Sequence, residues 1–287
     1  MKKQSFLLSV CLACSFAFTG ALAQSGKPLF TQALGVQSYT FRNSFPLGVE
    51  ATLDTIQALG ITELEGGNPK GVTPEAFLQM LKARNIRVPS IGAGYEQIVK
   101  DPQDVIQKAK FMGASYVMVA WIPHQKDSFT LADAQKAAED FNRVGKILKE
   151  NGLTFCYHNH GYEFRPYKNG TLFDYLAQNT NPEYVSFELD ILWAFHGGQD
   201  PVKLLNKYGN RWKLMHLKDL KKGVKGDFSG GTSTENDVAL GTGQIDIPAV
   251  LKAAKKAGIK HYFIEDESPH ESVQLPQTIA YIRSLKE

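Results

Sequence analysis

Cysteine is scarce in this chain. Three of its 287 residues are cysteines, and Cys11 and Cys14 lie in the N-terminal stretch that ends near residue 23. Once that stretch is removed, Cys156 stands alone, so no internal disulfide can form. The mature chain must then rely on its hydrophobic core, and roughly 260 residues are enough to bury one in a single domain.

The chain also lacks an apolar run long enough to span a membrane, which takes about 20 residues. Its N-terminal run, residues 6–18, follows the basic pair Lys2 and Lys3 and precedes the small-residue pattern Ala21-Leu22-Ala23. This arrangement is typical of a cleaved secretory signal peptide. We therefore predict that residues 1–23 are removed and that residues 24–287 form an exported protein, periplasmic or extracellular, with no membrane attachment after cleavage.

Lipidation is the weaker alternative to simple cleavage. Cys11 or Cys14 would be the acylated residue, but bulky Val10 precedes the first and Cys11 takes the place of the usual leucine before the second. The sequence therefore favours cleavage after Ala23.

Neither sign of charge is in excess. The chain has 32 basic and 29 acidic residues, and removal of Lys2 and Lys3 leaves 30 basic against 29 acidic. A balance this close to neutral argues against a protein that binds nucleic acid electrostatically. No glycine-rich phosphate-binding fingerprint follows the first expected strand, residues 34–41, which argues against a dinucleotide-binding fold.

What the chain does have is a regular alternation of strand-like and helix-like segments. Strands are expected at residues 34–41, 61–65, 86–91, 115–121, 153–157, 184–190, 212–217 and 262–265. Helices are expected at residues 49–59, 73–83, 102–112, 134–148, 171–178 and 247–257, and after residues 200 and 272. This alternation indicates a parallel sheet with crossover helices. We predict the α/β class and a single (β/α)8 TIM barrel, because a doubly wound open sheet, which shares the alternation, fits the number of units less well.

Ionisable residues come at the ends of four consecutive expected strands. They are His-Asn-His at 158–160, Glu-Leu-Asp at 188–190, His-Leu-Lys-Asp at 216–219 and Glu-Asp-Glu at 265–267. One polar residue at a strand end is commonly just solvated, but the carboxyl ends of barrel strands converge on one mouth, where active sites lie. Mixed imidazole and carboxylate ligands suit Mn²⁺, Zn²⁺ or Co²⁺. The sequence therefore predicts a site for one divalent metal ion.

These stretches resemble the xylose-isomerase-like TIM barrel family, whose members are often named sugar phosphate isomerases or epimerases. The resemblance rests on the order and spacing of Tyr157-His-Asn-His-Gly-Tyr-Glu-Phe164, Glu188-Leu-Asp190 with Trp193, Gly197-Gly-Gln-Asp-Pro201, His216-Leu-Lys-Asp219, Gly241-Thr-Gly-Gln-Ile-Asp246 and Ile264-Glu-Asp266, with weaker support from Val36-Gln-Ser-Tyr-Thr-Phe41. It covers mainly the last four strands, and it implies the same barrel.

The resemblance also implies a ligand set and a reaction. One metal ion would be held by one residue from each of strands five to eight, here His158, Asp190, His216 and Glu265. The metal would polarise a ketose, so that a base could remove the α-proton and give a metal-stabilised enediolate. Return of the proton gives an epimer or an isomer, whereas loss of a β-substituent gives elimination.

Strand five departs from the family pattern. Many epimerases of this family have glutamate where this chain has His158, so their two-glutamate proton shuttle does not carry over. We expect the base to be His160, Glu65 or Glu163. The alternative role for His160 is a hydrogen bond to a metal ligand.

Three further residues are candidates for contact with the substrate. Lys218 shares a strand face with His216 and is predicted to bind a substrate oxygen or stabilise an enolate, with a salt bridge as the alternative. Trp193 and His196 are predicted to bind substrate, Trp193 by stacking on a sugar face. Their alternative roles are to cap the barrel and to fill its core. The glycine-rich segment 221–244 is long enough to act as a lid.

These observations predict an exported, divalent-metal-dependent isomerase or epimerase of a non-phosphorylated keto-sugar, because sugar phosphates are cytoplasmic metabolites. Two alternatives stay open: a lyase or hydrolase that cleaves 3-keto-glycosides by metal-assisted elimination, and an inactive sugar-binding protein. Export and near-neutral charge disfavour a DNA-repair endonuclease of related fold. The expected partner is a small-molecule sugar or keto-glycoside, not nucleic acid, and the oligomeric state stays open.

Overall fold

The computed structural model describes residues 26–126 and 128–287. The signal peptide predicted at residues 1–23, like the lipidation considered at Cys11 or Cys14, lies outside the described residues and stays a prediction. Within the described part of the chain, every helix is too short or too polar to cross a membrane.

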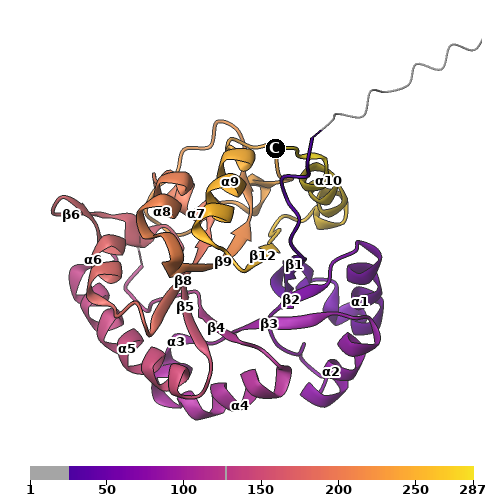
Figure 1. Cartoon of the computed structure of the whole chain (residues 1–287), viewed down its shortest axis with the longest axis horizontal. Coiled ribbons are helices and arrows are strands. Elements are labelled where there is room, and N and C mark those ends of the chain that lie inside the picture. The colour runs from indigo at the N-terminus through magenta and orange to yellow at the C-terminus, as the bar shows by residue number, and fades with distance from the viewer. Residues whose placement is uncertain (1–25, 127) are drawn as a thin grey trace, which may run out of the picture.

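Eight parallel strands close into one barrel (Figure 1). In order around the barrel they are β1 (Leu34–Gln37), β12 (His261–Ile264), β9 (Trp212–Leu217), β8 (Val185–Asp190), β5 (Thr154–His158), β4 (Tyr116–Val119), β3 (Arg87–Gly92) and β2 (Glu63–Glu65). Closure confirms the predicted TIM barrel and excludes the open doubly wound sheet. Because the strands are parallel, all their carboxyl ends lie at one mouth.

Helices pack around the barrel, most of them on its outside (Figure 1). They are α1 (Val49–Ala58), α2 (Pro74–Ala83), α3 (Tyr95–Lys100), α4 (Pro102–Met112), α5 (Leu131–Glu150), α6 (Leu172–Asn179), α7 (Ile191–His196), α8 (Pro201–Tyr208), α9 (Ile247–Ala257) and α10 (Glu271–Ser284). Several begin as the sequence predicts. Thr73 and Asp101 cap the N-termini of α2 and α4, and a proline follows each of them. Proline suits this position because the N–H that it lacks would have no partner in the first turn of a helix.

The end of the first strand and the segment that follows β8 differ from the expectation, and both lie at the mouth. The first strand stops at Gln37 instead of residue 41, because the Gln37 side chain accepts the backbone N–H of Tyr39 and starts a 3-10 turn at Ser38–Phe41. Helix α7 begins directly after β8, because the Asp190 carboxylate accepts the backbone N–H of Trp193 at 2.8 Å. Helix α3 was not predicted.

The barrel interior is layered from bottom to mouth. Cys156, Leu214 and Phe263 form a separate buried apolar cluster in β5, β9 and β12. Each lies two residues before an ionisable residue, namely His158, His216 and Glu265, and therefore faces the same side of its strand. The apolar layer thus supports a polar layer directly beneath the mouth.

The long segment 221–244 folds back over the mouth. Its two ends are joined by the antiparallel pair β10 (Asp219–Leu220) and β11 (Asp237–Val238). The Asp219 carboxylate accepts the backbone N–H groups of Gly241, Gly243 and Ile245 at 3.0–3.1 Å, which fixes the end of the segment. This contact gives the His216–Asp219 and Gly241–Asp246 motifs a structural reason to occur together.

Glycine is required where this segment touches the mouth. A Cβ on Gly226 would lie 1.8 Å from the carbonyl oxygen of His196. Gly230 has φ +70°, and a Cβ there would lie 2.9 Å from the ring of Tyr162 and 3.2 Å from the oxygen of His160. Only a backbone without side chains can pack this closely over the loops that follow β5 and β8.

Candidate active site

The structure brings together the four residues predicted as metal ligands. His158 and Asp190 are the last residues of β5 and β8, and His216 is the last but one of β9. Glu265 directly follows β12. One ligand atom from each lies within 4.8 Å of the others. All four side chains are buried, with 0–9% exposed.

The spacing of their ligand atoms fits one bound ion. The Nε2 of His158 lies 3.1 Å from Nδ1 of His216 and 3.5 Å from Oδ2 of Asp190. The same Nδ1 lies 3.2 Å from Oε2 of Glu265 and 3.8 Å from Asp190 Oδ2. Two ligands about 2.1 Å from a tetrahedral ion lie about 3.4 Å apart. Asp190 Oδ2 is buried with no hydrogen-bond partner in the described part of the chain, so these residues can hold a divalent metal ion.

Charge at the cluster also favours a cation. Burial alone would lower the pKa of His216, but the neighbouring Glu188 and Glu265 carboxylates raise that pKa well above its usual value. Burial would raise the pKa of Asp190, but the ammonium of Lys218 and the imidazole of His158 lower it. The cluster therefore carries ionised carboxylates in a site closed to water, which a bound cation would neutralise.

Glu65 lies beneath the cluster and touches it through His216. Its Oε2 lies 2.6 Å from Nε2 of His216, and Glu188 Oε1 lies 3.4 Å from the same nitrogen. Because 2.6 Å is shorter than the ~3.4 Å between two ligands of one ion, the Glu65 contact is a hydrogen bond. In the tautomer that donates from Nε2–H to Glu65, the Nδ1 lone pair of His216 is left for a metal ion. Glu65 therefore positions a ligand in this structure.

Loss of this hydrogen bond should weaken metal binding. We expect Glu65→Leu to raise the metal dissociation constant by about 10- to 100-fold, the usual cost of losing such a partner. Glu65→Gln keeps an oxygen that can accept from Nε2–H, so its metal dissociation constant should rise less. Competition with a chelating dye measures both constants. Equal affinity in Glu65→Leu and the wild-type protein would contradict the positioning role.

Lys218 is buried among carboxylates. Its ammonium lies 3.0 Å from Glu265, in contact with Glu267, and 3.9 Å from both Asp190 and Asp237. Burial would lower the pKa of Lys218, but these carboxylates raise it well above the usual value. The side chain is therefore a fixed cation beside the metal ligands.

Trp193, predicted to bind substrate, stacks at the mouth on His160, one of the predicted bases. The ring of His160 stacks on that of Trp193 with centroids 5.5 Å apart, and lies 4.9 Å from the ring of His158. Burial and the nearby His158 lower the pKa of His160 to about 3, so its imidazole is neutral at physiological pH. Its Nδ1 has no partner among the described residues. His196 packs against the far edge of Trp193, where its Nδ1 accepts from the backbone N–H of Asp227, and is not brought into the cluster.

Glu163 lies behind β5 and apart from the cluster. Its Oε1 accepts from the hydroxyl of Tyr157 at 2.8 Å and from the backbone N–H of His160 at 2.9 Å. Tyr157 faces outward against Phe141 of α5, with ring centroids 5.2 Å apart. The contacts of Glu163 are therefore to the outer face of the strand, and the structure does not bring it together with the predicted ligands.

The burial of Glu163 has a measurable consequence for stability. Burial raises its pKa to about 7 from the ordinary 4.5. Between those values the folded chain binds more protons than the unfolded chain, so stability falls as the pH rises through this window. We expect Glu163→Gln to make the free energy of unfolding less dependent on pH in this window. At pH 8 it should raise that free energy by on the order of 3 kcal/mol.

Urea unfolding of this variant at pH 5 and pH 8 provides the measurement. Glu139→Gln, which changes an exposed glutamate of α5, is the matched control and should follow the wild-type curve. If the stability of Glu163→Gln falls between pH 5 and pH 8 as much as that of the wild type, another group titrates in this window.

Two acidic residues of the site were missed in the sequence. Asp237 comes from the end of the long segment, accepts the backbone N–H of Glu267 at 2.8 Å and faces Lys218. Glu188 belongs to the predicted Glu-Leu-Asp strand end and shares a strand face with Asp190, yet the motif predicts no role for it; both its oxygens are buried without a hydrogen-bond partner within the residues described. Strand parity could have found Glu188. No periodicity marks Asp237, because its position depends on how the segment folds back.

The structure is a closed eight-stranded TIM barrel with a buried His/Asp/Glu cluster at its mouth that could hold a metal ion. The model of one family, the xylose isomerase-like TIM barrel, matches residues 53–285. The chain belongs to this family, as its motifs predict.

Curated relatives of the chain include several inosose dehydratases. That of Lacticaseibacillus casei is 23% identical over 241 residues, which cover 75% of this chain and 80% of that protein. Inosose dehydratase 2 of Bacillus cereus is 25% identical over 201 residues, which cover 62% of this chain and 67% of that protein. These relatives support an enzyme family that acts on sugar-like molecules.

Solved structures share the fold. A sugar phosphate isomerase/epimerase from Parabacteroides distasonis ATCC 8503 superposes with a TM-score of 0.73 at 23% identity, covering 93% of this chain and 97% of that one. The IolI protein with a bound zinc atom superposes with a TM-score of 0.68 at 14% identity, covering 88% of this chain and 95% of that one. The probable 3-DHS dehydratase AsbF from Bacillus anthracis gives 0.65 at 13% identity, with coverage of 88% and 98%.

Proposed function

We propose that the protein is a divalent-metal-dependent lyase that removes a β-substituent from a non-phosphorylated keto-sugar or 3-keto-glycoside. This reverses the order of the two enzyme functions that the sequence predicts. Curated relatives support the change, because they are named for the dehydration of inosose, a cyclic polyhydroxy ketone.

The observation that carries the proposal is the unpaired Nδ1 of His160 beside the cluster. His160 has an unpartnered Nδ1 in the described structure, whereas Oε2 of Glu65 is bonded to His216 and Oε2 of Glu265 to Lys218. Epimerisation needs proton acceptors on both faces of the α-carbon. Elimination needs one group that accepts the α-proton and then protonates the leaving group, and His160 can do both.

The side chains have distinct parts in this reaction. A divalent cation held by the cluster would supply Lewis acidity, which polarises the ketone and acidifies the neighbouring C–H. Nδ1 of His160 accepts the α-proton, and the ammonium of Lys218 stabilises the negative charge that develops on the ketone oxygen. The new C=C bond forms between the α- and β-carbons as the β-C–O bond breaks. The imidazolium of His160 returns the proton to the departing oxygen, which leaves as water or an alcohol.

A sugar isomerase or epimerase is the second candidate. The likeness to the Parabacteroides distasonis sugar phosphate isomerase/epimerase favours it. The same metal and the same first proton transfer would serve both reactions, and the fate of the enolate separates them.

The metal and the compartment are part of the proposal. The zinc atom in the IolI structure and the mixed nitrogen and oxygen ligands here support zinc, with Mn²⁺ or Co²⁺ as alternatives. The basic and apolar N-terminal pattern supports export of the mature chain, and export in turn supports a substrate without phosphate.

The experiment is a product analysis with defined metal content. Protein stripped by a chelator is reloaded with Zn²⁺, Mn²⁺ or Co²⁺ and incubated with inosose, methyl 3-keto-β-glucoside and a set of simple ketoses. The proposal expects an enone and released water or methanol, by mass spectrometry, only from loaded protein. An epimer or isomer as product would establish the second candidate. No turnover with any metal would favour an inactive sugar-binding protein.

A further inference from the structure

A groove opens at the mouth beside the cluster, above β1 and β2. It has a volume of about 640 Å³, and its lining residues include Gln37, Tyr39, Arg42, Phe45, Asn68 and Lys70. These residues come from the 3-10 turn after β1 and from the loop after β2. The volume is within the range of pockets that hold small molecules, about 300–1,000 Å³.

Two contacts link the lining of the groove to residues around the cluster. Gln37 pairs in register with Glu65, the residue bonded to His216. Arg42 donates a hydrogen bond to the backbone oxygen of Glu267, whose carboxylate contacts Lys218. The groove therefore continues from the strand ends that carry the site.

The long segment 221–244 covers the opposite side of the mouth. It packs on the loops that follow β5 and β8, where Gly230 meets Tyr162 and Gly226 meets His196. The cluster beneath it is nearly closed to solvent, with at most 9% of each side chain exposed. A substrate larger than one ring can therefore extend toward β1 and β2, where the groove lies.

The chemistry of the groove fits a second sugar ring. Tyr39 is 51% exposed, and the guanidinium of Arg42 lies 4.7 Å from its ring centroid and holds the ring in place. An exposed, fixed aromatic face can stack on the apolar face of a sugar. Asn68 and Lys70 supply polar groups beside it, and the described residues that line the groove include no carboxylate.

We propose that this groove is the leaving-group subsite of a 3-keto-glycoside lyase, and that it binds the sugar ring released by elimination. The inference rests on the proposed function and names its substrate class. The keto ring lies at the cluster, the C2–H bond breaks, the C1=C2 bond forms, and the C1–O bond to the second sugar breaks. That sugar leaves as an alcohol after it takes the proton.

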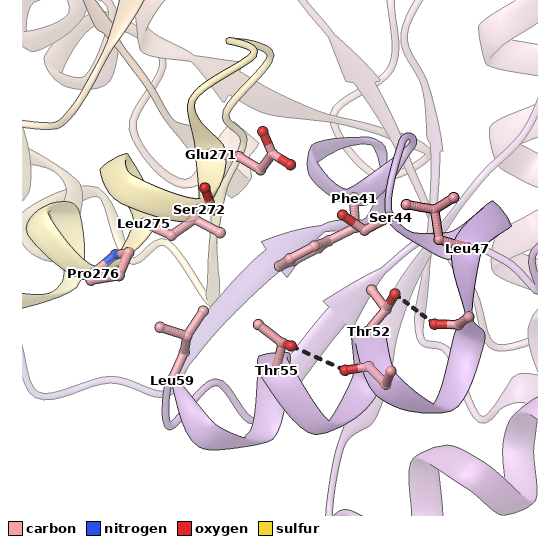
Figure 2. Close-up of a pocket in the computed structure, with 12 residues that line it drawn as sticks. Phe41, Ser44, Leu47, Thr52, Thr55, Leu59, Glu271, Ser272, Leu275 and Pro276 are labelled. Atoms are coloured by element: carbon pink, nitrogen blue, oxygen red, sulfur yellow. Dashed lines mark hydrogen bonds between the residues drawn. The ribbon is translucent and has the colours of Figure 1, made fainter.

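A second groove gives a matched control. It lies on the outside of the barrel between α1 and α10, has a volume of about 440 Å³, and is lined mostly by apolar side chains (Figure 2). Leu47 at its edge is 90% exposed. None of the described residues that line it belongs to the metal cluster, so Leu47→Ala should leave the reaction unchanged.

The test compares two substrates on three proteins. Zinc-loaded wild-type, Tyr39→Ala and Leu47→Ala are assayed with methyl 3-keto-β-glucoside and with a 3-keto-disaccharide that carries glucose as leaving group. We expect Tyr39→Ala to lower kcat/KM for the disaccharide by about tenfold or more, the scale of one lost aromatic stacking contact. Its kcat/KM for the methyl glycoside should stay within about twofold of wild type, and Leu47→Ala should match wild type on both.

The outcomes separate this inference from the function on which it rests. Suppose that the wild type eliminates methanol from the methyl glycoside. If Tyr39→Ala then lowers kcat/KM equally for both substrates, or for neither of them, the groove is not the leaving-group subsite. If the wild type eliminates from neither glycoside with any metal, the proposed function itself fails.

Discussion

His216→Ala is expected to remove bound metal and activity together. Its Nδ1 lies within 3.1–3.8 Å of ligand atoms from His158, Asp190 and Glu265, so its loss opens the centre of the cluster. Metal affinity should fall by more than the ~100-fold expected when a residue behind a ligand is lost, and turnover should reach background. Elemental analysis after gel filtration gives the metal content of each protein.

His261→Ala is the matched control for this change. His261 lies on β12 at the other end of the barrel, where its Nδ1 is 2.8 Å from Glu63. Its replacement should lower stability but leave the metal content unchanged. Equal metal content in His216→Ala and wild type would remove His216 from the site.

Lys218→Met should separate catalysis from metal binding. Its ammonium lies 3.0 Å from the ligand Glu265, yet a cation cannot itself ligate a metal ion. Methionine keeps much of the volume and removes the charge, so the metal should stay bound. Turnover should fall by about a hundredfold or more, the usual effect of losing one positioned electrostatic group.

Lys213→Met on the same strand provides the comparison. Lys213 is a partly exposed residue of β9 in the half of the strand away from the mouth, and its replacement should leave turnover unchanged. Unchanged kinetics in Lys218→Met would return Lys218 to a salt-bridge role. Loss of metal from that variant would show that the charge balance of the cluster, and not catalysis, depends on it.

The barrel could be predicted because its signals are local. Strand β9 has the expected bounds, and α9 begins and ends as its caps predict, at Asp246 and Gly258. A site at the mouth could be predicted because the carboxyl ends of parallel strands converge there. The resemblance to the family then indicated which residues form the cluster, among them His158 and Asp190.

The remainder depends on contacts between distant segments, which spacing does not reveal. Glu65 lies 151 positions from His216, and their hydrogen bond requires the barrel to close. The position of Asp237 depends on the fold of the long segment, and the end of β1 on a side-chain contact of Gln37. The sequence predicts Glu65 as a base because it cannot show that one of its two carboxylate oxygens is bonded to His216.

The proposed lyase activity is tested most directly by the fate of the α-proton in D₂O. Zinc-loaded protein is incubated with methyl 3-keto-β-glucoside and followed by proton NMR. The account predicts that methanol and the enone appear at equal rates, while the remaining substrate keeps its C2 proton. Deuterium that accumulates at C2 of intact substrate or of an epimer, without methanol release, would contradict elimination and establish proton exchange as the reaction of this site.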